Sequence, residues 1–93
     1  AMLPQGMKEN NAGIYPGYFL SLGMENEDVR NLQTYLKGIA DYSGVIPPIA
    51  VTGVFDEATR DAVAALQAQN DLPPTGNVGP ATWNLIRRLY NAR

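Results

Sequence analysis

Apolar residues recur at helical spacing in three segments of the chain, and each segment opens with residues that favour a helix start. In the first segment Asn26 can cap the helix, and the acidic Glu27 and Asp28 suit the positive end of its dipole. The inward face of this helix is expected to consist of Val29, Leu32, Leu36 and Ile39. We expect Gly38 to end this helix or to loosen its last turn.

The second and third segments start in a related way. Asp56 is the expected N-cap of the second helix, with Glu57 in its first turn. In the third helix Gly79 takes the cap position and Pro80 the first helical position, where proline is favoured. The inward stripes are Thr59, Ala62, Val63 and Leu66 in the second helix and Thr82, Leu85, Ile86 and Leu89 in the third. Three arginines gather at the negative end of the third helix: Arg87, Arg88 and Arg93.

The segments outside these helices lack a helical apolar period. Residues 1–13 predict a tag remnant and linker. Residues 14–20 combine a Pro-Gly turn pair with aromatic and aliphatic side chains, which predicts an extended arm docked on the core. Residues 41–51 are expected to form a long loop, because a glycine and two consecutive prolines exclude a helix there.

The second and third helical segments are copies of one another. Thr52–Thr59 aligns with Thr75–Thr82 at a constant offset of 23 residues, and the inward stripes of the two helices align at the same offset. A weaker third echo relates Val29, Leu32 and Gln33 to Val63, Leu66 and Gln67. The sequence therefore predicts an all-α fold, a closed three-helix bundle with a partly duplicated loop-helix unit.

Composition restricts the chemistry available to this chain. Its 93 residues include no Cys and no His, which excludes disulfides, thiolate sites, Ser-His triads and nearly every zinc hydrolase site. Seven basic and nine acidic residues give a net charge of −2, which argues against binding to duplex nucleic acid. No segment approaches the about 20 apolar residues of a membrane span. We expect no enzyme activity, no cofactor or metal, no nucleic-acid partner and no membrane insertion.

Two groups of acidic residues resemble possible sites, but their positions favour structural roles. Glu25, Glu27 and Asp28 lack the spacing of a calcium loop and suit a solvated helix start. Asp56 and Asp61 could be paired carboxylates of a glycoside hydrolase, but Asp56 has a capping role and Asp61 lies off the apolar stripe.

These motifs, in this order, resemble the peptidoglycan-binding domain family, a three-helix wall-binding module. The resemblance covers roughly Tyr15 to Tyr90. It rests on Leu22-Gly23, Glu27–Arg30 and Leu32-Gln33 for the opening helix, on Thr52–Thr59, Ala62-Val63 and Leu66-Gln67 for the turn and second helix, and on Leu72, Thr75–Gly79, Thr82-Trp83 and Leu85 for the closing helix. The Tyr15–Gly17 tract and the loop around Pro47-Pro48 are similar to versions in clostridial cell-wall and spore-cortex proteins.

Three positions depart from the pattern of the family. Thr52 stands where the family usually has Asp, Asp56 where it usually has Gly, and Leu66 where it often has Phe. The first two positions border the loop beside the expected groove. The departures therefore bear on ligand preference and hardly on the fold.

The resemblance implies that residues 14–93 form a non-catalytic module that holds a cell-wall hydrolase or another wall protein against peptidoglycan. It also implies a ligand in the glycan or the stem peptide, a catalytic domain in the parent chain, and a place outside the cell, in the wall or the spore cortex. The alternative is a protein–protein interaction module with the same three-helix fold. A helix-turn-helix DNA reader is a third option, which the charge opposes.

Candidate ligand-binding residues are expected around a shallow groove between the helices and the two Thr-Gly loops. Trp83 lies about 100° from the centre of its helix stripe, so its ring either flanks the core or stacks on a sugar. The rings of Tyr35 and Tyr42 are likewise expected either to flank the core or to contact the ligand. Arg60 or Arg30 could pair with a stem-peptide carboxylate, although a solvated surface arginine is more common. The full candidate set is Gln33, Tyr35, Tyr42, Asp56, Arg60, Asn77 and Trp83.

A second set of residues is expected to be structural: Gly53, Phe55, Thr59, Gly76 and Thr82. The two glycines should adopt turn conformations with unusual backbone angles. Each threonine hydroxyl is expected to return a hydrogen bond to the backbone of its helix cap, while its methyl group joins the core.

Overall fold

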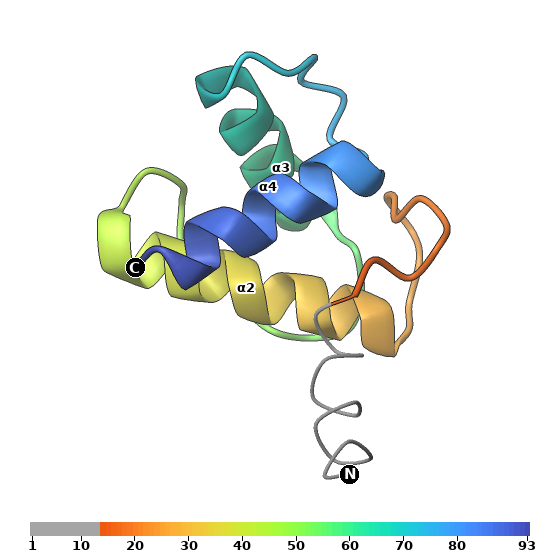
Figure 1. Cartoon of the computed structure of the whole chain (residues 1–93). Coiled ribbons are helices and arrows are strands. Elements are labelled where there is room, and N and C mark those ends of the chain that lie inside the picture. Colours follow the sequence, from red (N-terminus) through yellow and green to blue (C-terminus); the bar gives the residue numbers. More distant parts are fainter. Residues whose placement is uncertain (1–13) are drawn as a thin grey trace, which may run out of the picture.

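The computed structural model describes residues 14–93, which form three helices. These are α2 (Glu27–Ser43), α3 (Glu57–Gln69) and α4 (Pro80–Asn91), and no regular strand occurs within the described residues. Helix α4 crosses α2, and α3 lies above both helices in the view of Figure 1. This arrangement confirms the predicted all-α three-helix fold. The expected tag remnant at residues 1–13 lies outside the described residues.

The three helices begin where the sequence predicts. The side chain of Asn26 accepts a hydrogen bond from the Val29 amide at the start of α2, at 2.9 Å. Asp56 does the same for Thr59 at the start of α3. Helix α4 has Gly79 at the cap position, followed by a proline, and has no side-chain cap hydrogen bond. Local capping chemistry therefore accounts for two of the three starts, and proline for the third.

Helix α2 continues beyond the predicted end. The expected weakening at Gly38 and the expected loop start at Asp41 are wrong, because α2 runs through Ser43 and ends at Gly44, whose φ of 69° suits glycine. The rest of the predicted loop, residues 44–51, is outside any helix. Gly38 serves packing instead. A Cβ atom at this position would lie 2.6 Å from a ring carbon of Tyr90, so the glycine lets α4 approach α2 closely.

The core collects apolar side chains from the helices, the arm and the loops. The inward stripes predicted from the sequence, Leu85 included, are buried, with one exception: Leu89 is only half-buried. Two core residues, Phe55 and Val78, occupy equivalent positions just before α3 and α4. The other members of the cluster are Leu20, Val29, Leu32, Leu36, Ile39, Ala40, Ile46, Ile49, Ala62, Val63, Leu66, Trp83 and Ile86.

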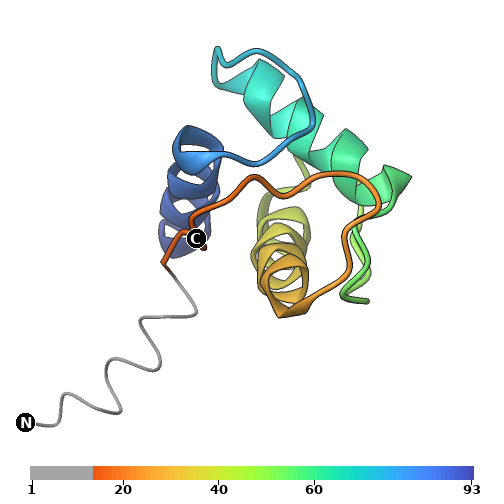
Figure 2. The same cartoon turned by 90° about the vertical axis from the view of Figure 1, so that its right-hand side faces the viewer.

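The arm of residues 14–25 joins the two copies of the loop-helix unit. Leu20 exchanges two backbone hydrogen bonds with Val78, at 3.0 and 2.9 Å, before α4. Farther along, the Gly23 amide donates to the Phe55 carbonyl at 2.9 Å, and the Phe55 amide donates to the Met24 carbonyl at 2.8 Å. The arm passes across the bundle between these two points (Figure 2). The docked arm predicted for residues 14–20 is therefore present, and its contacts continue to Met24.

None of the helices in residues 14–93 is long and apolar enough to cross a bilayer.

Candidate functional site

A buried glutamine, Gln33, holds the first Thr-Gly loop through hydrogen bonds to the loop backbone. Oε1 of Gln33 accepts hydrogen bonds from the amides of Thr52 and Gly53, at 2.9 and 2.7 Å. Its Nε2 donates to the carbonyl of Val54 at 2.8 Å and to the hydroxyl of Thr59 at 3.0 Å. Gln33 is 0% exposed, so its amide supports the loop and does not face a ligand. We refer to Gln33 with residues 52–59 as the first loop unit.

The second Thr-Gly loop repeats this arrangement. Oε1 of Gln67 accepts from the Gly76 amide at 2.9 Å, and its Nε2 donates to the Asn77 carbonyl at 2.9 Å and to the Thr82 hydroxyl at 3.0 Å. Gly53 and Gly76 have φ values of 86° and 81°, which confirms the predicted turn conformations. Gln67 with residues 75–82 is the second loop unit, and its buried glutamine could have been identified only from the sequence echo with Gln33.

Thr59 binds the side chain of the cap and not its backbone. Its hydroxyl donates to Oδ1 of Asp56 at 2.8 Å, and its amide donates to the same oxygen at 2.9 Å. The expected bond to the cap backbone is therefore wrong, because the Thr59 hydroxyl donates to the Asp56 carboxylate and accepts from Nε2 of Gln33. The two hydrogen bonds to the carboxylate lower the pKa of Asp56, the backbone bond contributing most. The candidate Asp56 thus acts as the cap of α3.

Trp83 is a core residue. Of its two predicted roles the structure shows the one in the core, and the burial is deeper than that of a flank, because the side chain is only 1% exposed. The arm is the reason: Tyr15 meets the indole edge-on at 6.2 Å between ring centroids, and Tyr35 meets it at 5.9 Å. A sugar ring has no access to either face. Tyr35 itself is half-buried between Trp83 and Tyr90, and this burial raises the pKa of its hydroxyl.

Arg60 and Asn77 remain near the Thr-Gly loops. The guanidinium of Arg60 pairs with Asp61 at 3.3 Å on a solvated surface. Its methylene groups pack on Gly76, where a Cβ atom would lie 2.5 Å from Arg60 Cγ. The exposed Asn77 lines a shallow depression of about 200 Å³ together with Phe19. This surface is accessible, but it offers little depth.

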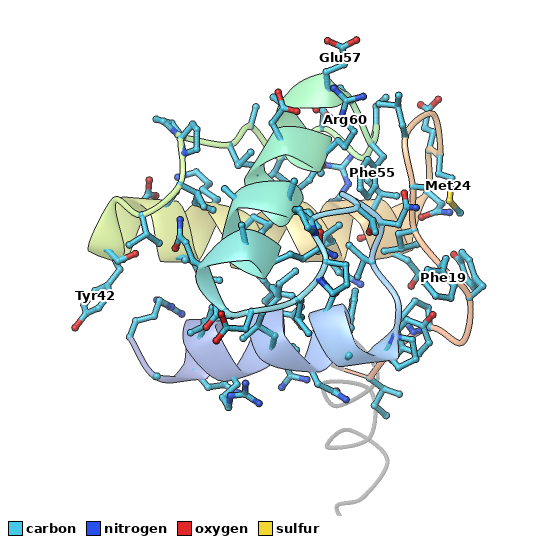
Figure 3. The ribbon with its side chains drawn as sticks, turned by 90° about the horizontal axis from the view of Figure 1, so that it is seen from above. Phe19, Met24, Tyr42, Phe55, Glu57 and Arg60 are labelled. Atoms are coloured by element: carbon cyan, nitrogen blue, oxygen red, sulfur yellow. The ribbon has the colours of Figure 1, made fainter. Side chains whose placement is uncertain are left out.

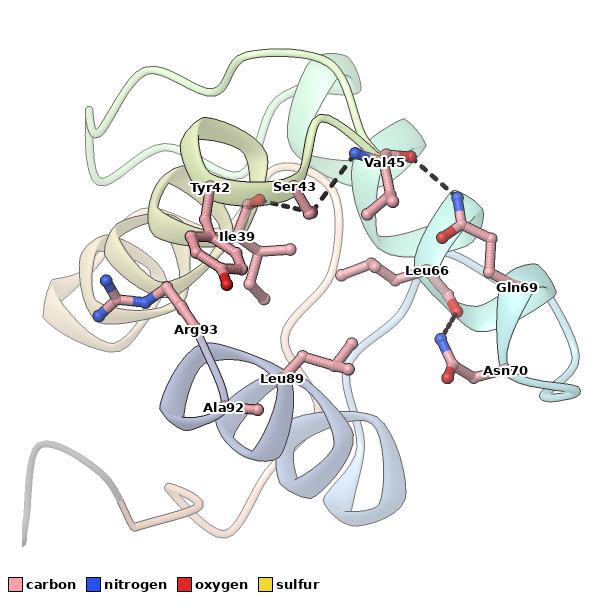
Figure 4. Close-up of a pocket in the computed structure, with 10 residues that line it drawn as sticks. All are labelled: Ile39, Tyr42, Ser43, Val45, Leu66, Gln69, Asn70, Leu89, Ala92 and Arg93. Atoms are coloured by element: carbon pink, nitrogen blue, oxygen red, sulfur yellow. Dashed lines mark hydrogen bonds between the residues drawn. The ribbon is translucent and has the colours of Figure 1, made fainter.

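A second opening lies at the other end of the bundle, where the last turns of α2, α3 and α4 meet (Figure 4). Its floor is aliphatic and consists of Ile39, Leu66 and Leu89. Tyr42 stands at its edge with 70% of its surface exposed. The volume is about 320 Å³, and we call this opening the helix-end hollow. Its remaining lining residues are Ser43, Val45, Gln69, Asn70, Ala92 and Arg93.

The structure does not bring the candidate residues into one groove. Tyr42 projects from the end of α2, whereas Arg60 lies in the first turns of α3 (Figure 3). Gln69, at the hollow, follows Arg60 by nine positions in α3, which corresponds to about 13.5 Å of helix. Nothing in the sequence indicated that Gln69, Asn70 and Arg93 lie near one another, because Gln69 and Asn70 end α3 whereas Arg93 follows α4, and only folding brings these two helix ends together.

Residues 25–86 match the family model described as a peptidoglycan binding domain. The chain belongs to this family. The resemblance seen in the sequence is thereby confirmed, and the chain is a peptidoglycan-binding module. A relative, the zinc D-Ala-D-Ala carboxypeptidase of Streptomyces albus G, is 40% identical over 72 residues. The aligned part is 77% of this chain but 27% of that enzyme, so the chain spans about a quarter of the length of the relative.

The family match covers residues 25–86 and leaves out part of the surface of the peptidoglycan-binding domain. It includes both loop units with their buried glutamines, and it includes the hollow residues from α2 and α3. It stops at residue 86, before Leu89 and Arg93, and it begins after Leu20. The last turn of α4 and most of the arm are therefore features of this chain outside the matched region.

Proposed function

We propose that this peptidoglycan-binding domain is a non-catalytic anchor that holds a cell-wall hydrolase or another wall protein on peptidoglycan. Family membership supports the ligand, and the similarity to a carboxypeptidase of greater length supports a catalytic domain elsewhere in the parent chain. The proposed place of action is outside the cell, in the wall or the spore cortex. Among residues 14–93 no cluster of three or more metal-ligating side chains occurs, and Asp56 is engaged in capping.

The binding proposal rests on the exposed position of Tyr42 at the edge of the helix-end hollow. An aromatic ring that is 70% exposed beside an aliphatic floor gives a ligand apolar surface without further rearrangement. A small site of this kind supports dissociation constants of about micromolar to millimolar. On a polymer with many repeats, several weak contacts of one wall protein would together give firm retention.

The experiment is co-sedimentation with purified insoluble peptidoglycan, comparing two exposed aromatic residues. Tyr42→Ala is expected to weaken binding about 5- to 10-fold, equivalent to about 1 to 1.4 kcal/mol, because it removes one aromatic contact. Phe19→Ala is the matched control, since Phe19 is 61% exposed beside the second Thr-Gly loop. Both proteins should retain the thermal stability of the parent, because neither side chain is in the core.

Other outcomes would place the binding site at the Thr-Gly loops or contradict the proposal. If Phe19→Ala or Arg60→Ala weakens sedimentation while Tyr42→Ala does not, binding occurs at the Thr-Gly loops and the hollow is not the site. If the parent protein does not sediment with peptidoglycan, the anchor proposal is wrong. The interaction-module alternative then takes its place, favoured by exposed apolar residues on the arm, Ile14, Phe19 and Leu22.

A further inference from the structure

The start of α4 carries three hydrogen-bond donors that have no acceptor within residues 14–93. Two are the amides of Ala81 and Thr82 in the first helical turn, and Gly79 has no side chain that could accept from them. The third is the hydroxyl of Thr82, which accepts from Nε2 of Gln67 at 3.0 Å and donates to no described residue. Thr82 is 6% exposed, so this unpaired proton lies in a largely buried side chain.

The first loop unit shows which group completes such a set of donors. At the start of α3, Oδ1 of Asp56 accepts from the amide of Thr59 at 2.9 Å and from its hydroxyl at 2.8 Å, while that hydroxyl accepts from Nε2 of Gln33. The offset of 23 residues places Thr82 where Thr59 stands and Gly79 where Asp56 stands. The second unit therefore repeats the glutamine and the threonine of the first unit but lacks its carboxylate.

Phe19 occupies the space that a capping side chain at Gly79 would need. A Cβ atom on residue 79 would lie 2.5 Å from a ring carbon of Phe19. The ring belongs to the arm and lies beside the start of α4 (Figure 3). Position 79 therefore cannot carry a cap like Asp56 unless Phe19 moves, and a group from outside the chain can take the place of that cap.

The shallow depression beside the second Thr-Gly loop gives a ligand access to these donors. Thr82, Ala81 and Gly79 line it together with the polar residues Thr75 and Asn77. No acidic residue lines it, and the positive end of the α4 dipole favours an anion at this place. Its volume of about 200 Å³ is below the roughly 300 Å³ at which sites for whole small molecules begin, which suits one group of a larger ligand.

We propose that the start of α4 binds a carboxylate of a ligand in the place that Asp56 takes at the start of α3. The carboxylate accepts from the amide and the hydroxyl of Thr82, and the amide of Ala81 is the further donor. This site lies apart from the helix-end hollow and does not depend on the proposed function. A stem peptide of the wall and an acidic side chain of a protein both present the required group.

The test is an NMR titration of the whole chain with acetate, with sodium chloride holding the ionic strength constant and acetamide as the neutral probe of similar shape. Acetate should shift the amide signals of Ala81 and Thr82 with half-saturation on the order of 10 mM, as expected for one small group. Chloride and acetamide should leave these signals in place. The equivalent amides of Ala58 and Thr59 should not respond, because Asp56 already occupies their site.

Two substitutions should exchange the behaviour of the two helix starts. Asp56→Gly removes the carboxylate of the first unit, so acetate should then shift the amide of Thr59. The double variant Phe19→Ala/Gly79→Asp supplies a carboxylate to the second unit and should abolish the response of Thr82. Phe19→Ala alone is the matched control and should keep the response, since the Phe19 side chain has no donor. Circular dichroism checks that each variant is folded.

Two peptide probes distinguish the sources of the carboxylate. One is a synthetic stem tetrapeptide with free carboxylates, and the other is an acetylated and amidated peptide with one central aspartate. The probe that shifts the Thr82 amide at the lower concentration identifies the source, and either result supports the site. The fully amidated tetrapeptide and the asparagine form of the second peptide should have no effect on this signal.

Three results would overturn the inference. They are an absence of acetate shifts at Ala81 and Thr82, equal shifts with acetamide, and a double variant that still responds as Phe19→Ala does. A response of Thr59 in Asp56→Gly without a response of Thr82 in the parent would likewise contradict it, because the two units would then differ in the site itself. Co-sedimentation with peptidoglycan tests the proposed function separately, so either can fail while the other stands.

Discussion

The two loop units share a buried glutamine and differ in how they start the next helix. In the first unit Asp56 caps α3 through a carboxylate that accepts two hydrogen bonds from Thr59. In the second unit Gly79 precedes a proline, and α4 has no side-chain cap. Both units nevertheless hold a Thr-Gly turn against a glutamine. The comparison teaches that the glutamine contacts define the repeat, whereas the helix cap can be replaced.

The glutamines also differ in the number of groups they satisfy. Gln33 accepts from two amides, those of Thr52 and Gly53, whereas Gln67 accepts from the single amide of Gly76. Each glutamine donates to one loop carbonyl and one threonine hydroxyl at 3.0 Å or less. The first unit therefore depends more strongly on its glutamine than the second does.

The largest expected effect comes from removing these amides. Gln33→Leu should lower the free energy of unfolding by about 3 to 5 kcal/mol and Gln67→Leu by about 2 to 3, since each buried group left without a partner costs about 1 to 3 kcal/mol. Urea unfolding of both variants measures the difference. Equal losses would mean that the additional amide contact of Gln33 makes no net contribution.

The aligned leucines of α3 and α4 give the next comparison. Leu66→Ala should cost about 2 to 5 kcal/mol, because Leu66 is fully buried. The sequence offset makes Leu89 its equivalent, but Leu89 is only half-buried beside the hollow, so Leu89→Ala should cost about half as much. Thermal unfolding of the two variants tests this. A loss for Leu89→Ala as large as that for Leu66→Ala would show that α4 buries this position in solution.

The smallest expected effect concerns the cap that only the first unit has. Asp56→Ala should cost about 1 kcal/mol, the usual contribution of an N-cap side chain. The lowered pKa of Asp56 means that this contribution is complete above the ordinary pKa of an aspartate, near 4, and is lost as the pH falls through the lowered value. Urea unfolding at a series of pH values from neutral to acid measures it.

Asp56→Asn is the control for this prediction. Asparagine also caps helices well, but it does not titrate. The variant should therefore keep most of the stability at neutral pH and lose less of it in acid than the parent does. A parent and an asparagine variant with identical pH dependence would contradict the assignment of the lowered pKa to the cap.

Helix starts were predictable because their causes are local. The caps Asn26 and Asp56 and the first-turn Pro80 act within a few residues, so a single sequence contains the whole argument. The offset of 23 residues likewise predicted that the two Thr-Gly turns would be equivalent. The end of α2 was not predictable in this way, because Gly38 is tolerated for its contact with Tyr90, which lies in another helix.

The candidate site was predicted only in part, for the same reason. Tyr42 was predicted either to flank the core or to contact a ligand, and its exposed place at an opening depends on α3 and α4. The role of Trp83 could not be decided from the sequence, because helical geometry gives its angle on α4 but not the cover that Tyr15 of the arm provides. The role of Gln33 in the loop depends on residues well separated from it in sequence, and composition gives no sign of it.

The backbone pairing of Leu20 with Val78 has a consequence for the order of folding. Its partners are separated by more than half of the chain, and the contact of Gly23 with Phe55 closes a second large loop inside the first. Closing such loops costs entropy before any contact forms, so the turns next to the helices assemble more readily than the arm pairs with them. The amides of Leu20 and Val78 would then gain protection from exchange last during refolding, and their protection would mark the moment when both copies of the repeat are joined.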